Sequence, residues 1–216
     1  MHATVVTIEG IIGSGKTTLC RALSQISEGR WDVLEEPVAE NPYLEKFYQD
    51  MPRWALEMQI HLLWRRFDLH QRAVWGDGPV LMDRSIYGDT CFARLHRAAG
   101  NIDELGIETY LGLWRSMSRF LRYPDVVVFL DVAPVVALRR VTERARGCET
   151  GLTVEYLEAL DHQYGILMDE MEHYTTVLRV PWEASWSEDA VSSLLYRLNI
   201  LREDDTRRYL KGTGRL

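Results

Sequence analysis

The stretch Gly10-Ile11-Ile12-Gly13-Ser14-Gly15-Lys16-Thr17 follows the pattern G-x-x-x-x-G-K-[ST], which is typical of a loop that binds phosphate groups. Its glycines allow successive backbone N–H groups to point at phosphate oxygens. Lys16 can then reach the β- and γ-phosphates, and the Thr17 hydroxyl can ligate Mg²⁺. A strand is expected before this loop, at residues 4–8, and a helix after it, at residues 17–23. We therefore expect ATP or another nucleoside triphosphate to bind at Gly10, Gly13, Ser14, Gly15, Lys16, Thr17 and Thr18.

The size and composition of the chain suit one enzyme-sized domain. Its 216 residues are 46% hydrophobic, which is enough for an ordinary core. The net charge of −7 argues against a general nucleic-acid binder. We expect neither a signal peptide nor a membrane helix, because a strand begins early and no apolar run approaches about 20 residues. The three cysteines have no metal-ligand spacing and indicate a reducing, cytoplasmic compartment.

Strand-like and helical segments alternate along the chain. Besides the first strand, we expect strands at residues 31–35, 79–82, 125–131 and 175–180. The alternation predicts an α/β fold with a five-stranded parallel sheet flanked by helices. Residues 1–201 would form a single domain, and residues 202–216 a charged tail. The helices are expected at residues 42–48, 52–74, 85–99, 107–121, 134–144, 154–173 and 188–201.

Charged residues follow two of these strands. Glu36 comes after the second strand, and Asp83-Arg84 after the third. Ligands bind beyond the carboxyl ends of parallel strands, so these side chains are candidates for the chemistry of a phosphoryl-transfer site. A carboxylate there can accept a proton or help to hold Mg²⁺, and an arginine can neutralise the transferring group. From spacing alone, a solvated turn carboxylate at Glu36 and a surface ion pair at Asp83-Arg84 remain open.

Arginines gather at residues 139–146, just before a glycine-containing segment at 147–151. Arg140 and Arg144 are four residues apart and share a helix face. Beside a phosphate loop, such a cluster indicates a lid that closes on the triphosphate, with a solvated basic face as the alternative.

The helix expected at residues 52–74 is aromatic and mostly apolar. Gln59 and Arg66 are seven residues apart and lie on one face of it. A buried glutamine can recognise a planar heterocycle, because its amide both donates and accepts hydrogen bonds. The alternative is a core helix with ordinary surface polar residues.

Taken in order, these motifs resemble the deoxyribonucleoside kinase family, and especially its bacterial branch. The resemblance rests on the loop at residues 10–17, on Glu36-Pro37-Val38 and on Asp83-Arg84-Ser85 with Asp89 four residues later. The arginine-rich segment and the helix after it, which contains Glu155-Tyr156-Leu157, are also similar, as is Asn41-Pro42-Tyr43-Leu44. The likeness spans about the first 175 residues, and the conjunction is more specific than any single motif.

The resemblance implies a reaction, in which the γ-phosphate of ATP passes to the 5′-OH of a deoxynucleoside with the help of Mg²⁺. Glu36 would be the base, Arg84 and Lys16 would contact the transferring phosphate, and Thr17 and Asp83 would position Mg²⁺. Tyr48 and Glu149 would hold the 3′-OH, and Gln59 would pair with the base beside Arg66 and Asp89. The remaining implied residues are Phe47, Trp54 and Met58 in the base pocket and Arg140, Arg144 and Arg146 in the lid.

The resemblance also implies a homodimer, and a preference for purine deoxynucleosides or deoxycytidine over thymidine through the Arg66/Asp89 pair. Two positions depart from the family pattern. Ile11 stands where many members have Asn, and Phe92 comes three residues after Asp89 where relatives often have Phe at the following position, here Ala93. The second departure concerns the partner that stacks on the base.

Two other functions remain open at this stage. A nucleoside monophosphate kinase of the thymidylate kinase type shares the phosphate loop and the Asp-Arg pair, but it usually lacks Glu-Pro-Val after the second strand. A non-catalytic relative could serve as a structural subunit or a nucleotide-regulated binding module. The joint presence of Lys16, Thr17, Glu36 and Arg84 disfavours that reading.

Overall fold

The computed structural model describes residues 3–35, 41–144, 151–182 and 187–199. Its centre is a five-stranded sheet in the order β2-β3-β1-β4-β5. All four neighbouring pairs are parallel, so the predicted fold class is confirmed. The strands span Val5–Glu9 (β1), Asp32–Leu34 (β2), Val80–Asp83 (β3), Val126–Asp131 (β4) and Thr176–Pro181 (β5).

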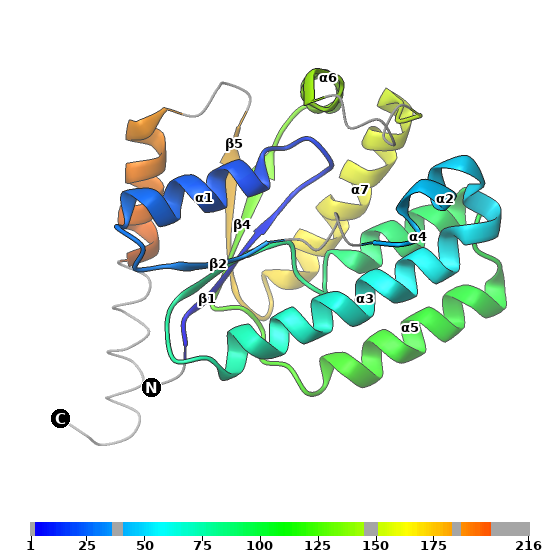
Figure 1. Cartoon of the computed structure of the whole chain (residues 1–216), viewed down its shortest axis with the longest axis horizontal. Helices are drawn as coiled ribbons and strands as arrows, with labels where there is room; N and C mark the ends of the chain where they lie inside the picture. Colours follow the sequence, from blue (N-terminus) through cyan, green and yellow to red (C-terminus); the bar gives the residue numbers. More distant parts are fainter. Residues whose placement is uncertain (1–2, 36–40, 145–150, 183–186, 200–216) are drawn as a thin grey trace.

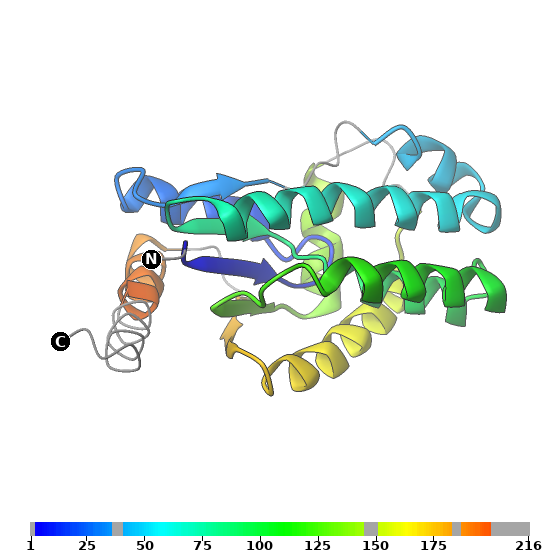
Figure 2. The ribbon, with the colours of Figure 1, turned by 90° about the horizontal axis from the view of Figure 1, so that it is seen from below.

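Helices cover both faces of this sheet. α1 and the helix at residues 188–199 lie on one side, and α3, α4, α5 and α7 on the other (Figure 1). Figure 2 shows α3 and α5 extending side by side beyond the sheet, where they pack against each other. The helices span Lys16–Ile26 (α1), Leu44–Gln49 (α2), Met51–Trp75 (α3), Asp89–Ala98 (α4), Glu104–Ser118 (α5), Pro134–Arg144 (α6) and Val154–Met171 (α7).

The two central strands form the heart of the core. Every residue of β1 is buried, and in β4 all but the terminal Asp131 are buried. This burial on both faces matches the near-continuous apolar sequence expected of strands within a parallel sheet. No helix in the described part of the chain is long and apolar enough to cross a membrane.

Local hydrogen bonds explain where several helices begin. Asp103 accepts a hydrogen bond from the Gly106 backbone N–H at 2.7 Å, so α5 begins at Glu104, three residues before the expected start. The Thr153 side chain caps α7 in the same way. The expectation of a helix from residue 85 is wrong, because α4 begins only at Asp89. The Ser85 backbone N–H and hydroxyl instead donate hydrogen bonds to Glu9, and residues 86–88 form a turn.

Candidate active site

A cavity of about 600 Å³ lies at the carboxyl ends of the strands. The phosphate loop and α1 line one end of it, and α2, α3 and α4 line the other. Sheets of this type bind ligands at this edge. The described residues that line the cavity include twelve sequence-predicted site residues: Gly13, Gly15, Lys16, Thr17, Thr18, Phe47, Tyr48, Met58, Gln59, Arg66, Asp83 and Arg84. The lid candidates Arg140 and Arg144 line it as well.

The phosphate loop has the tight turn that its glycines predict. Gly13 has φ +81°, and a Cβ on it would lie 2.8 Å from Cγ2 of Val141 on α6. Only glycine therefore fits between the loop and α6. The Lys16 ammonium lies in the loop, where it donates to the backbone oxygens of Gly10 at 3.1 Å and Ile11 at 2.9 Å. Ser14, another predicted site residue, is fully buried within the loop.

Thr17 and Asp83 meet at the floor of the cavity. The Thr17 hydroxyl, at the start of α1, donates a hydrogen bond to Oδ2 of Asp83, the last residue of β3. β1 and β3 are neighbours, which brings these residues together across 66 positions of sequence. A hydroxyl and a carboxylate are the hard oxygen donors that Mg²⁺ prefers. Such a pair suits an ion that keeps most of its bonds for phosphates and water.

Arg84 is held tightly beside that pair. It is 3% exposed and has a left-handed backbone, with φ +73°. Such a conformation is costly for a side chain with a Cβ and tends to occur at functional sites. Its guanidinium lies 4.7 Å from the centre of the Phe92 ring and donates a hydrogen bond to the Tyr164 hydroxyl. This buried cation at the cavity wall can face a phosphoryl group.

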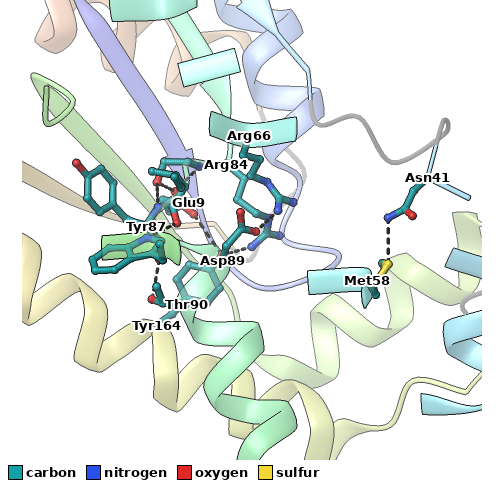
Figure 3. A network of polar contacts seen from close by, with 12 residues as sticks. Glu9, Asn41, Met58, Arg66, Arg84, Tyr87, Asp89, Thr90 and Tyr164 are labelled. Atoms are coloured by element: carbon teal, nitrogen blue, oxygen red, sulfur yellow. Dashed lines mark hydrogen bonds and ion pairs between the residues drawn. The ribbon is translucent and has the colours of Figure 1, made fainter. Parts of the chain in front are cut away.

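The other end of the cavity combines apolar walls with a few polar groups. Gln59 is buried on α3, and among the described residues its Oε1 accepts no hydrogen bond. Arg66, two turns further along α3, forms an ion pair with Asp89 at the start of α4 (Figure 3). Arg66 lines the cavity and Asp89 does not, so Asp89 holds the Arg66 side chain from outside the lining. An amide with a spare acceptor beside a guanidinium suits a ligand with both donors and acceptors on one edge.

Two aromatic residues, Trp54 and Phe92, differ from what the resemblance implies. Trp54 is not among the described lining residues; its ring packs against Tyr43 at 5.9 Å and beneath the Arg53 guanidinium at 4.3 Å. Phe92, in contrast, does line the cavity despite its departure from the family spacing. The fully buried Ala93 that follows it is not a lining residue.

The arginine cluster on α6 is split between two environments. Arg140 is partly buried and donates to the backbone oxygens of Ser14 at 3.2 Å and Trp182 at 2.8 Å. Burial lowers the pKa of its guanidinium, though the group remains charged. Arg144 is exposed, and Arg139, also exposed, does not line the cavity and lies 3.8 Å from Glu143. Three predicted site residues, Glu36, Arg146 and Glu149, lie outside the described residues.

The structure adds residues that the motifs did not reveal. Glu9, the last residue of β1, is 1% exposed, and its carboxylate lies behind Arg84 with the Tyr164 hydroxyl. His96 on α4 lines the cavity, with its ring edge-on to Phe47 at 5.1 Å. Asn41 also lines it and donates to the Met58 sulfur at 3.0 Å (Figure 3). The one sequence signal for Glu9 was its position as a charged residue at the end of an apolar strand. No motif in the sequence assigned a role to His96 or Asn41.

Known proteins with related sequences are nucleoside kinases. The chain is 35% identical over 182 residues to deoxyadenosine kinase from Dictyostelium discoideum, and this aligned region covers 84% of this chain and 74% of that protein. It is also 35% identical over 163 residues to deoxyadenosine/deoxycytidine kinase from Bacillus subtilis, covering 74% of each protein. Among solved structures, deoxyadenosine kinase from M. mycoides with the products dCMP and dCDP superposes with a TM-score of 0.81. That structure is 25% identical and covers 92% of this chain and 100% of its own.

The family model agrees with these individual proteins. Residues 6–199 match the model described as deoxynucleoside kinase, so the match includes both the phosphate loop and the cavity-lining residues of α2, α3 and α4. By sequence, fold and site, the chain belongs to the deoxynucleoside kinase family of ATP-dependent phosphotransferases.

Proposed function

We propose that this enzyme transfers the γ-phosphate of ATP to the 5′-OH of a purine deoxynucleoside or deoxycytidine, in preference to thymidine. The observation that carries the proposal is that one cavity is lined both by Lys16 and Thr17 and by Gln59 and Arg66. Arg84 lines the same cavity. A triphosphate at the loop and a nucleoside beside α3 would place the reacting atoms next to Arg84.

Each side chain then has one role. The 5′-oxygen attacks the γ-phosphorus as its proton passes to the Glu36 carboxylate, and the bond to the β,γ-bridging oxygen breaks to release ADP. Lys16 binds the β- and γ-phosphates in place of its present backbone partners, Gly10 and Ile11. Arg84 stabilises the charge of the transferring group. Thr17 and Asp83 would hold Mg²⁺, which neutralises phosphate charge when it is bound.

Charge around the cavity supports a polyanionic ligand at the loop end. Lys16, Arg21, Arg84, Arg140 and Arg144 all line it. The carboxylates of the described lining are Glu35, Asp83 and Glu143, and Glu35 already pairs with Arg21 at 2.6 Å. A net positive lining raises the local concentration of a nucleoside triphosphate and favours its binding.

The preference for particular nucleosides rests on the Arg66–Asp89 pair and on the relatives. The relatives are named for deoxyadenosine, deoxyguanosine and deoxycytidine. A fixed guanidinium beside the Gln59 amide offers donors to the ring nitrogens and carbonyls of those bases. We further propose that the enzyme is a homodimer and acts in the cytoplasm, as the family resemblance implies.

A panel of substrates tests the proposal. Purified enzyme with ATP and Mg²⁺ would be given deoxyadenosine, deoxyguanosine, deoxycytidine and thymidine, and kcat/KM would be measured for each. The expected result is turnover of at least one of the first three well above that of thymidine. Deoxynucleoside monophosphates serve as the comparison acceptors. Faster phosphorylation of a monophosphate would assign the chain to monophosphate kinase chemistry instead.

A further inference from the structure

A buried chain of hydrogen bonds runs from Arg84 into the core (Figure 3). The Arg84 guanidinium donates through Nη1 to the Tyr164 hydroxyl, which donates in turn to Oε2 of Glu9 at 3.2 Å. The other carboxylate oxygen of Glu9 accepts from the Ser85 backbone N–H at 2.7 Å and from the Ser85 hydroxyl at 2.6 Å. All four residues are 3% exposed or less. The chain thus links β1, α7 and the turn after β3.

The direction of each bond in this chain is fixed by chemistry. A guanidinium can only donate, so the Tyr164 oxygen must accept from Arg84. The single hydroxyl proton of Tyr164 is then available only for Glu9. Burial raises the pKa of Glu9, whereas the Arg84 charge and the two Ser85 hydrogen bonds lower it. In its ionised form the carboxylate accepts from all its neighbours and carries the charge that balances the buried guanidinium. Burial raises the pKa of the Tyr164 phenol, which keeps that proton in place.

Glu9 therefore helps to hold both the backbone and the guanidinium of Arg84 in place. The peptide that follows Arg84 is fixed through the Ser85 N–H, which maintains the left-handed backbone of Arg84. The guanidinium is fixed through Tyr164 and contacts two rings, with centroids 4.7 Å away for Phe92 and 5.6 Å away for Tyr164. Gly88 is part of the same arrangement, because a Cβ there would lie 2.5 Å from Oε2 of Glu9.

We propose that Tyr164 is a positioning residue for phosphoryl transfer, which with Glu9 holds the Arg84 guanidinium where the phosphoryl group passes. The proposal rests on the role assigned above to Arg84. An arginine stabilises charge that forms only in the transition state most effectively when its guanidinium is already in position before the reaction. Loss of its support should therefore lower kcat and leave substrate binding almost unchanged.

The test is Tyr164→Phe, which keeps the ring against Arg84 and removes only the hydroxyl. We expect kcat to fall by about tenfold to a hundredfold, with the KM values for ATP and the nucleoside within about twofold of wild type. Tyr110→Phe is the matched control. Tyr110 is also fully buried, but its hydroxyl has no hydrogen-bond partner among the described residues, and it does not line the cavity. The control should keep wild-type kcat.

A double-mutant cycle with Arg84→Ala separates positioning from general support of the fold. If Tyr164 acts through Arg84, Tyr164→Phe lowers kcat in the wild-type background but has no further effect when Arg84 is already alanine. An equal loss in both backgrounds would overturn the proposal, as would wild-type kcat for Tyr164→Phe. If Arg84→Ala itself kept full activity, the failure would lie in the role given to Arg84.

A second variant covers the case in which Tyr164→Phe does not fold. Glu9→Gln keeps the size of the side chain but replaces one acceptor oxygen with an NH₂ group. Ser85 and Tyr164 then compete for the one oxygen that remains, so either the backbone or the guanidinium of Arg84 loses its anchor. The same loss of kcat with unchanged KM is expected. A folded Glu9→Gln enzyme with wild-type kcat would contradict the proposal.

Discussion

Arg66 and Asp89 form an ion pair that is almost wholly buried, with side-chain exposures of 2% and 1%. The two residues come from α3 and α4, which pack against each other beside the cavity. Removal of one partner leaves a buried charge without its counter-ion, which costs about 3–5 kcal/mol. We therefore expect Arg66→Met and Asp89→Ala each to lower both the thermal stability and kcat/KM for every nucleoside.

The double variant Arg66→Met/Asp89→Ala should behave differently from the sum of the two. It leaves no stranded charge, and it opens space beside the base for the 5-methyl group of thymine. We expect its kcat/KM for thymidine to exceed that of the wild type. Kinetics on the full cycle of four proteins measures this coupling. The specificity assignment would fail if the wild-type enzyme already preferred thymidine over deoxycytidine and both purine nucleosides.

Glu36→Gln tests the general base. The change keeps the shape of the side chain and removes its capacity to take a proton, so kcat should fall by about a hundredfold or more. ATP binding should persist, because the phosphate loop is unchanged. Glu158→Gln makes the same change of charge at an exposed position on α7 and should be silent. Near-normal turnover by the Glu36 variant would remove it from the mechanism.

The lid assignment predicts different outcomes along α6. Arg144→Ala removes an exposed cation that lines the cavity, so kcat/KM for ATP should drop while the melting temperature stays constant. Arg140→Ala should affect both quantities, since Arg140 also bonds to the backbone oxygens of Ser14 and Trp182. Arg139 is exposed on the same helix and does not line the cavity, so Arg139→Ala is the control. Full activity in both lid variants would leave only a solvated basic face.

Two buried histidines predict acid sensitivity of the fold. Burial lowers the pKa of both His70 and His96 to about 4, against 6.5 in the unfolded chain. As the pH falls from 6.5 towards 4, the unfolded chain takes up these protons and the folded chain does not. The free energy of unfolding should thus fall by up to about 1.4 kcal/mol per pH unit for each histidine, and level off below about pH 4.

Urea unfolding at pH 7.5, 6 and 5 measures this effect in the wild type and in His96→Gln. The buried carboxyl of Glu9 has a raised pKa and acts in the opposite direction, but it is common to both proteins. The difference between the two pH profiles therefore isolates His96. Parallel profiles would show that His96 is not kept neutral by the fold.

The sequence predicted helix starts that depend on neighbouring residues, and it missed one that depends on a distant residue. The start of α6 agrees with expectation, because Pro134 opens the helix as a first-turn proline commonly does. The shift of α4 to Asp89 was not predictable, since the competing partner of Ser85 is Glu9, 76 positions earlier. A local pattern carries no information about such a distant acceptor.

The same distinction applies to the cavity. The phosphate loop and Asp83-Arg84 could be placed together because both follow strands of one parallel sheet. Tyr164 could not, because its apolar helical spacing in α7 is that of any core residue and its partner Glu9 is 155 positions away. Trp54 shows the converse. The resemblance implied a place in the base pocket, whereas the ring packs against Tyr43 and lies beneath the Lys46 and Arg53 side chains.

The central place of β1 has a consequence for how the protein is made. Val5 pairs with Val80 of β3, and Val6 pairs with Val126 of β4, so the first strand is completed by segments synthesised much later. These are long-range pairings whose loop-closure cost slows folding. More than half of the chain must leave the ribosome before the phosphate loop has a strand on each side of its base. Until then, the unpaired backbone edges and the apolar side chains of β1 are exposed to chaperones and to other nascent chains.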